Sequence, residues 1–191
     1  MRKKLCWLSV LMLVLALPLS AASEVEMLQF ISRAGISKSE FSTPFKETRA
    51  FPRKEKVTLT GTLQYRSPDF LDMVYEHPDQ EHFLIDGTKM INRREGREVK
   101  SDLTRNQLMR RLANTLLYAF SGQVEKISTE QNTTLKVSEV KNEYHVILDA
   151  CKKQAMGYCH IEIHYRKSDG QIVFMQMDEF NGTSTIYALA E

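Results

Sequence analysis

Apolar and polar residues alternate along the chain from residue 57 onward, with the period of two that is typical of a β-strand with one buried face. The alternation runs through VTLTGTLQYR (57–66), stops at Ser67-Pro68 and resumes in LDMVYE (71–76). Residues 82–95 then predict another pair of strands around a turn at Asp86-Gly87. Together these segments predict an antiparallel meander.

The apolar spacing changes to that of a helix in residues 24–34, where Val25, Leu28 and either Phe30 or Ile31 recur at helical intervals. Gly35 is expected to end this helix. The interval that follows, up to residue 55, is polar and is expected to be loop-like, although it contains three phenylalanines, Phe41, Phe45 and Phe51.

A second helical pattern occupies residues 104–122. Thr104 and Gln107 form a capping-box signature at its start, and Gly122 is a plausible stop. One face of this helix is an apolar stripe, which consists of Leu108, Leu112, Leu116 and Phe120. The stripe either closes a core or acts as a lid over a bound ligand.

The remainder of the chain returns to strands, at about residues 133–140, 143–150, 159–167, 171–179 and 184–189. Turns are expected at Lys141-Asn142, Asp169-Gly170 and Asn181-Gly182. Hairpins interrupted by a few helices predict an α+β protein: one large, curved antiparallel sheet with helices on one face, and with room for an apolar cleft between them.

The first residues have the features of a secretory signal peptide, spanning residues 1–22. Three basic residues precede an apolar run and a small-residue cleavage zone. Removal of this segment leaves one predicted domain, residues 23–191, with 23 basic and 24 acidic residues and so a formal charge of about −1. That balance argues against a nucleic-acid partner.

Two cysteines, Cys151 and Cys159, remain in the predicted domain. Their close spacing permits a disulfide in an oxidising compartment. Strand parity, however, turns Cys151 outward and Cys159 inward, so a bridge would need an irregular turn, and two separate thiols are the alternative.

No catalytic constellation is found in the sequence, and the protein is expected not to be an enzyme. A nucleophile elbow is absent. His160, Glu162 and His164 share one strand face, but the two histidines would stand about 13 Å apart, which is too far for one metal ion. His145 could add a ligand, but these side chains are expected to be a solvated outer face. The basic run 92–100 is expected to be a solvated loop, with attraction of acidic head groups or of an acidic partner as the alternative.

The order of these segments resembles the LolA-like outer-membrane lipoprotein carrier family, in particular its divergent branch, over almost the whole predicted domain. The matching features are the glycine-led strand 61–65, Pro68, Pro78, Asp86-Gly87, and the segment 178–185 with its Asn181-Gly182 turn. The resemblance implies an unclosed antiparallel β half-barrel with a helical lid over its concave face. It also implies a monomeric periplasmic carrier without cofactors, which takes acyl chains from an inner-membrane exporter to an outer-membrane receptor.

A lipid would then be bound by the apolar concave face, because each buried methylene contributes roughly 0.8 kcal/mol. The expected cavity residues are Leu59, Leu63, Tyr65, Leu71, Met73, Tyr75, Phe83, Ile85, Ile161, Ile163 and Met175, and the expected lid residues are Leu108, Leu112, Leu116 and Phe120. The alternative is a periplasmic sensor or an accessory subunit of an envelope export system that binds protein or lipid in the same groove.

Two departures from the resembled family favour a lipid cargo other than a lipoprotein. The family has an arginine directly before the strand-opening proline, where it holds the lid closed, whereas this chain has Ser67 there. Arg66 stands one residue earlier and, by parity, on the other face. The family's usual strand tryptophan is also absent near Val74-Tyr75.

Overall fold

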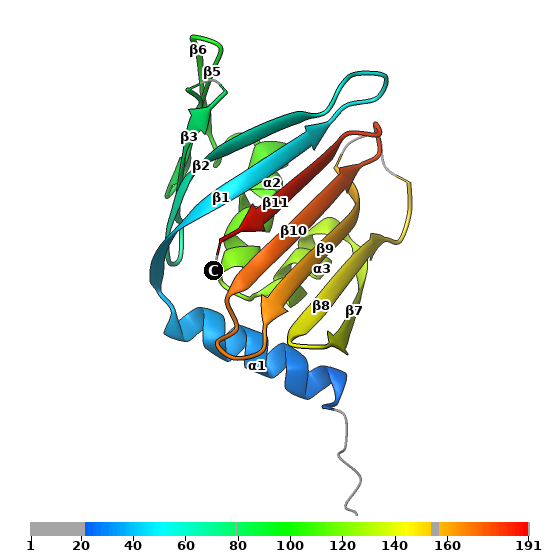
Figure 1. Ribbon diagram of the computed structural model, residues 1–191. Coiled ribbons are helices and arrows are strands. Elements are labelled where there is room, and N and C mark those ends of the chain that lie inside the picture. Colours follow the sequence, from blue (N-terminus) through cyan, green and yellow to red (C-terminus); the bar gives the residue numbers. More distant parts are fainter. Residues whose placement is uncertain (1–21, 79, 154–156, 191) are drawn as a thin grey trace, which may run out of the picture.

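The computed structural model describes residues 22–78, 80–153 and 157–190, so the predicted signal peptide, apart from Ala22, lies outside the described residues. The described chain forms one antiparallel sheet of eleven strands with three helices (Figure 1). The helices are α1 (Glu24–Ser37), α2 (Gln107–Phe120) and α3 (Val124–Gln131). The strands are β1 (Glu40–Ala50), β2 (Val57–Arg66), β3 (Phe70–His77), β4 (His82–Asp86), β5 (Lys89–Arg94), β6 (Arg97–Asp102), β7 (Thr133–Val140), β8 (Glu143–Ala150), β9 (Tyr158–Arg166), β10 (Ile172–Glu179) and β11 (Ser184–Leu189).

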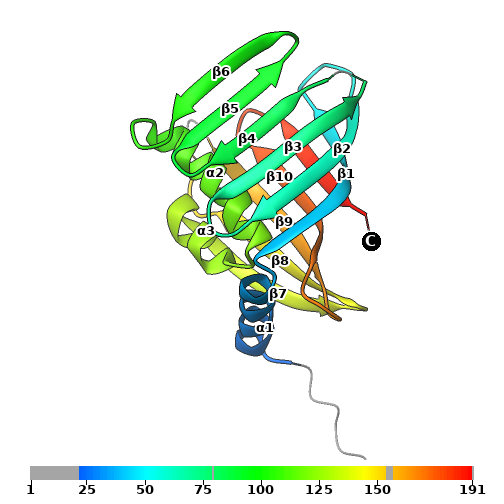
Figure 2. The same ribbon diagram turned by 90° about the vertical axis from the view of Figure 1, so that its left-hand side faces the viewer.

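The strand order is β6-β5-β4-β3-β2-β1-β11-β10-β9-β8-β7, so the two halves of the sheet meet where β1 pairs with β11. The sheet curves around α2 and α3 but does not close into a barrel, and α1 lies across one end of it (Figures 1 and 2). The predicted fold class, a curved antiparallel half-barrel with helices over its concave face, is confirmed.

The strand β1 was missed, because residues 40–50 were expected to be a loop. This strand joins the two halves of the sheet and pairs with β2 along almost its whole length. Its inward positions alternate apolar and polar side chains, since Thr43 and Glu47 are buried beside Phe45. Because polar residues occupy part of the inner face, the apolar/polar alternation that predicts a strand is absent from this segment of the sequence. Pro44 is tolerated because it stands where the pairing with β11 begins, and its carbonyl accepts a hydrogen bond from Ala190 N at 3.0 Å.

The basic segment 92–100 was also predicted wrongly as a loop. It is a hairpin, in which β5 and β6 pair across a turn at Glu95 and Gly96. Both turn residues have positive φ, 51° and 73°, as a tight hairpin turn requires. The side chains of β6 are mostly exposed, so the segment is solvated although it is a strand. The short helix α3 had no sequence prediction.

The helix α1 continues through Gly35 to Ser37, so the prediction that Gly35 ends it was wrong. Gly35 instead permits a close approach, because a Cβ atom at this position would lie 2.0 Å from the carbonyl oxygen of Ser121, just after α2. Gly122, with φ +68°, ends α2 as predicted and lies against the carbonyl of Ile31. Backbone contact between these helices thus fixes α1 against the C-terminal end of α2.

The helix α2 begins later than the capping-box signature predicted. Asn106 is its N-cap residue, and the Asn106 side chain accepts a hydrogen bond from Met109 N at 3.1 Å. The Thr104 hydroxyl donates instead to Asp102 at 2.6 Å. Asn is a stronger N-cap residue than Thr, which accounts for the later start.

Candidate functional site

Most of the predicted cavity residues fill the hydrophobic core. Ten of them are buried: Leu59, Leu63, Tyr65, Leu71, Met73, Tyr75, Ile85, Ile161, Ile163 and Met175. Phe83 is partly buried against the same core. Only Tyr75 and Phe83 of this set line the cavity between the sheet and α2. Of the predicted lid residues, Leu112 and Leu116 line that cavity as well, whereas Phe120 packs in the core and Leu108 is half-buried on α2.

The cavity has a volume of about 320 Å³, which is at the lower end of the roughly 300–1,000 Å³ typical of ligand pockets. It lies between the N-terminal half of α2 and the inner face of strands from both halves of the sheet. Its apolar wall consists of Phe51, Tyr75, Phe83, Met90, Met109, Leu112, Ala113, Leu116, Tyr158, Met177 and Tyr187. Three of these side chains are methionines, which adapt to the shape of a flexible ligand.

A charged cluster interrupts this apolar wall. Glu47 on β1 is 1% exposed, and its carboxylate accepts hydrogen bonds from Tyr75 Oη at 2.5 Å and from Arg49 Nε at 2.5 Å. Arg49 Nη1 donates to Glu81 Oε2 at 2.7 Å, and Glu81 Oε1 lies 3.1 Å from Arg94 Nε. We call these five residues the Glu47 cluster.

Burial and the neighbouring Glu47 carboxylate together set the protonation of Tyr75 and Arg49. Burial first, and then the negative charge of Glu47, raise the pKa of Tyr75 well above its usual value of about 10. Burial lowers the pKa of Arg49, but the hydrogen bonds and the negative charge of Glu47 have the larger combined effect. The pKa of Arg49 is therefore raised above its usual value. Tyr75 therefore stays a neutral donor and Arg49 a cation at neutral pH. The cluster thus pairs two carboxyl groups, Glu47 and Glu81, with two guanidinium groups, Arg49 and Arg94.

The cavity is suited chemically to an amphiphile. Its apolar wall excludes water from a hydrocarbon chain, and the Glu47 cluster offers donors and acceptors to a polar group. One feature of the sequence points to this cluster, since Glu47 and Arg49 share the parity of Phe45 on β1. The signal is weak, because acidic residues are rarely buried.

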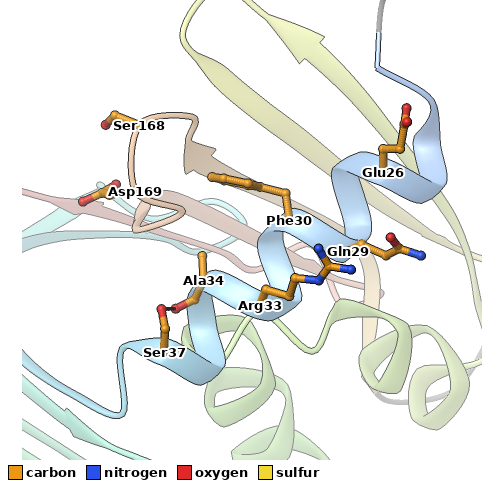
Figure 3. Close-up of a pocket in the computed structure, with 8 residues that line it drawn as sticks. All are labelled: Glu26, Gln29, Phe30, Arg33, Ala34, Ser37, Ser168 and Asp169. Carbon is orange, nitrogen blue, oxygen red and sulfur yellow. Dashed lines mark hydrogen bonds between the residues drawn. The ribbon is translucent and has the colours of Figure 1, made fainter.

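A second hollow, of about 640 Å³, lies on the surface between α1 and the turn that joins β9 to β10 (Figure 3). Six of its eight lining residues are polar or charged, among them Glu26, Arg33 and Asp169 around Phe30. The Asp169 carboxylate already pairs with Lys38 Nζ at 2.6 Å. This hollow lacks the apolar wall of the cavity under α2.

The remaining sequence predictions concern the cysteines and the outer face. Cys151 is exposed and Cys159 is half-buried, and both are free thiols rather than a disulfide. The Cys159 thiol donates to the carbonyl of Asp178 at 3.3 Å, on the neighbouring strand β10. His160 and His164 lie with their side chains partly exposed on the face of β9 opposite to the buried Ile161 and Ile163.

The arginine latch of the resembled family has no counterpart at Ser67. Arg66 is exposed, and its guanidinium lies 4.2 Å from the ring centroid of Phe70, on the side of β2 away from the core as parity predicts. The helix α2 is held elsewhere, because Tyr165 Oη donates to the carbonyl of Ala119 at 2.8 Å. The sheet thus holds the C-terminal end of α2, while its N-terminal half covers the cavity.

No family model and no curated protein sequence matches the chain. Solved structures with a similar fold include a LolA superfamily protein from Nitrosomonas europaea, which is 8% identical with a TM-score of 0.41 over 90% of this chain and 93% of that chain. The lipoprotein LppX of Mycobacterium tuberculosis is 8% identical with a TM-score of 0.41 over 88% and 95%. In the MucA/MucB complex of Pseudomonas aeruginosa, the match is 14% identical with a TM-score of 0.41 and covers 88% of this chain but 56% of the other.

Similarities of this size do not transfer a function, so the functional assignment rests on the cavity and the Glu47 cluster. Among the described residues, no helix is long and apolar enough to span a membrane.

Proposed function

We propose that this protein is a periplasmic, non-enzymatic carrier that binds the acyl chain of a lipid or lipoprotein between the sheet and α2. The observation that carries this proposal is the cavity itself, in which an apolar wall with three methionines surrounds the Glu47 cluster. The acyl chain lies against the apolar wall, and the polar end of the cargo faces the cluster. The predicted signal peptide supports the periplasmic location.

Entry of an acyl chain requires the N-terminal half of α2 to move. Two contacts that fix this helix, at Ala119 and Ser121, lie at its C-terminal end. Met109 and Leu112 lie toward the other end and line the cavity. Displacement of this half exposes the cavity while the C-terminal end stays fixed, so α2 acts as the lid.

The test is a binding titration with a fluorescent long-chain fatty acid, using Leu112→Gln and Leu108→Gln as a matched pair. Both leucines lie on α2 one turn apart, but only Leu112 lines the cavity. Burial of a leucine side chain contributes roughly 1.5–3 kcal/mol, and 1.4 kcal/mol is tenfold in affinity. Leu112→Gln should therefore weaken binding about tenfold, and Leu108→Gln should change it little.

Absence of probe binding to the wild-type protein, together with absence of lipid in its native mass spectrum, would overturn the proposal. Equal weakening by both variants would place the ligand elsewhere. A protein-binding accessory role would then be the better assignment, and crosslinking in the cell envelope would detect its partner. The exposed apolar side chains Val25 and Ile36 on α1 are a candidate surface for that role.

A further inference from the structure

Two histidines and two carboxylates form a compact group on the outer face of β8 and β9, away from the cavity. His145 and His164 are directly opposite each other in the antiparallel pairing. Glu143 precedes His145 by two residues and Glu162 precedes His164 by two residues, so all four side chains lie on one face. This cross-strand arrangement brings together ligands that neither strand could supply alone.

The distances around Glu143 agree with those between ligands of one metal ion. Glu143 Oε2 lies 3.1 Å from His145 Nε2 and 3.3 Å from His164 Nδ1. In a tetrahedral zinc site with bonds of about 2.0–2.1 Å, neighbouring ligand atoms are roughly 3.3–3.4 Å apart. One ligand atom from each of the three residues lies within 4.8 Å of the other two.

A second carboxylate orients one of these histidines. Glu162 Oε1 lies 2.8 Å from His164 Nε2, on the opposite side of the ring from Glu143. A proton held on Nε2 by Glu162 leaves the lone pair of Nδ1 directed toward Glu143. Metal-binding histidines are commonly held in this way, with a carboxylate on the nitrogen that does not bind the metal.

We propose that Glu143, His145 and His164 bind a divalent transition-metal ion, with zinc as the ion that this donor set favours. Glu162 acts as the outer carboxylate, and the fourth position of the ion faces solvent. The two imidazole rings are stacked, with centroids 3.6 Å apart and planes at 8°. Binding therefore involves rotation of the rings about their second side-chain torsion, which is a soft coordinate.

The local charge balance supports a cation at this place. Glu143 and Glu162 supply two negative charges on either side of the histidine pair, while Arg166 is the register partner of Glu143. Arg166 also lies 3.6 Å from Asp169, which offsets part of its charge. His160, farther along β9, is engaged by Asp149 at 2.7 Å and lies outside the three-ligand group.

The experiment is a calorimetric titration with zinc chloride of the untagged protein, stripped of metal with a chelator. The background carries Cys151→Ser and Cys159→Ser, because both free thiols could bind zinc themselves. One equivalent of zinc should bind. His145→Ala and His164→Ala should each abolish this binding, and Glu162→Gln should weaken it 10–100-fold.

His160→Ala is the matched control, since it removes a histidine from the same strand face without touching the three ligands. Its zinc affinity should stay close to that of the background protein, because His160 pairs with Asp149 at 2.7 Å and lies 4.0 Å from the outer carboxylate of Glu162. Binding should also weaken in acid, because the ligands must be deprotonated to bind the ion. Absence of zinc binding in the background protein, or equal binding by the His145→Ala and His160→Ala variants, would refute the site.

Discussion

Glu47 is an acidic side chain in a mostly apolar environment, and its hydrogen bonds explain how it is tolerated. Its carboxylate accepts from Tyr75 and twice from Arg49, so its charge is compensated in place. Buried ion pairs seldom stabilise a protein more than well-packed apolar residues of similar volume would. Stability alone therefore does not account for the Glu47 cluster, which agrees with the polar-group binding proposed for it.

Glu47→Gln should lower the free energy of unfolding by about 3–5 kcal/mol, because it leaves Arg49 buried with only part of its compensation. Chemical denaturation followed by circular dichroism measures this loss. The matched control is Glu98→Gln, which removes a carboxylate from an ion pair with Arg93 on the exposed hairpin of β5 and β6. That change should leave the free energy of unfolding almost unchanged, because this ion pair is exposed to solvent. Similar losses in the two variants would contradict the role given to Glu47.

The alternation of apolar and polar residues predicted which face of the sheet a side chain occupies. It did not predict whether that side chain packs in the core or lines the cavity. Leu59 and Tyr75 both face inward as predicted, yet Leu59 is enclosed in the core whereas Tyr75 lines the cavity. The difference depends on what packs above each residue, which is α2 and strands far away in the sequence. Glu47 could not be predicted for a related reason, since its partner Tyr75 lies on another strand.

At the scale of elements, the contact between α1 and the end of α2 depends on one residue without a side chain. Gly35→Ala would place a methyl group 2.0 Å from the carbonyl oxygen of Ser121, and this backbone atom cannot turn aside as a flexible side chain would. Overpacking of this kind costs typically 1–3 kcal/mol, so the free energy of unfolding should fall by at least about that amount.

Arg33→Ala is the control for this substitution, because Arg33 lies on the same helix and is exposed. Its effect on stability should stay within about 0.5 kcal/mol. Thermal and chemical unfolding measure the free energy of unfolding of both variants, which should fall for Gly35→Ala and stay nearly unchanged for Arg33→Ala. If Gly35→Ala unfolds like the wild-type protein, the two helices are not in the close contact described here.

The sequence predicted elements where periodicity was strong and failed where inward positions were polar. Strands β7 to β11 were predicted to within a residue at their ends, because their inner faces are mostly apolar. The strand β1 was missed because Thr43 and Glu47 occupy its inner face. The helix α3 is only eight residues long and has a weak amphipathic pattern, so tertiary packing of Val124 and Ile127 determines it rather than propensity.

Across the whole molecule, buried tyrosines lie in both halves of the sheet, and one of them contacts a helix. Tyr75 lies on β3, Tyr187 on β11, and Tyr165 on β9 reaches the end of α2. Burial is the largest cause that raises the pKa of each of these three phenols above the usual value of about 10. The native protein therefore keeps three protons at a pH where the unfolded chain releases them.

This difference fixes the sign of the stability change in alkali. A tyrosine whose pKa is raised in the native state contributes its full stabilisation below about pH 10, which is the pKa of tyrosine in the unfolded chain. This stabilisation is lost as the pH rises above that pKa, because only the unfolded chain then releases the proton. Each phenol contributes a slope of up to about 1.4 kcal/mol per pH unit. The tyrosinate absorbance of these residues should therefore appear together with the loss of circular dichroism, rather than as separate titrations of a folded protein.

Tyr165→Phe separates this effect from the loss of a contact. The variant lacks the hydrogen bond to Ala119, which should lower stability by about 0.5–1.5 kcal/mol below the usual tyrosine pKa of about 10. It also lacks one of the phenols whose pKa is raised, so the decline in unfolding free energy between about pH 10 and pH 11 should be shallower by up to about 1.4 kcal/mol per unit. An unchanged slope in denaturant titrations across this range would mean that Tyr165 ionises in the native protein, and that the sheet does not enclose it.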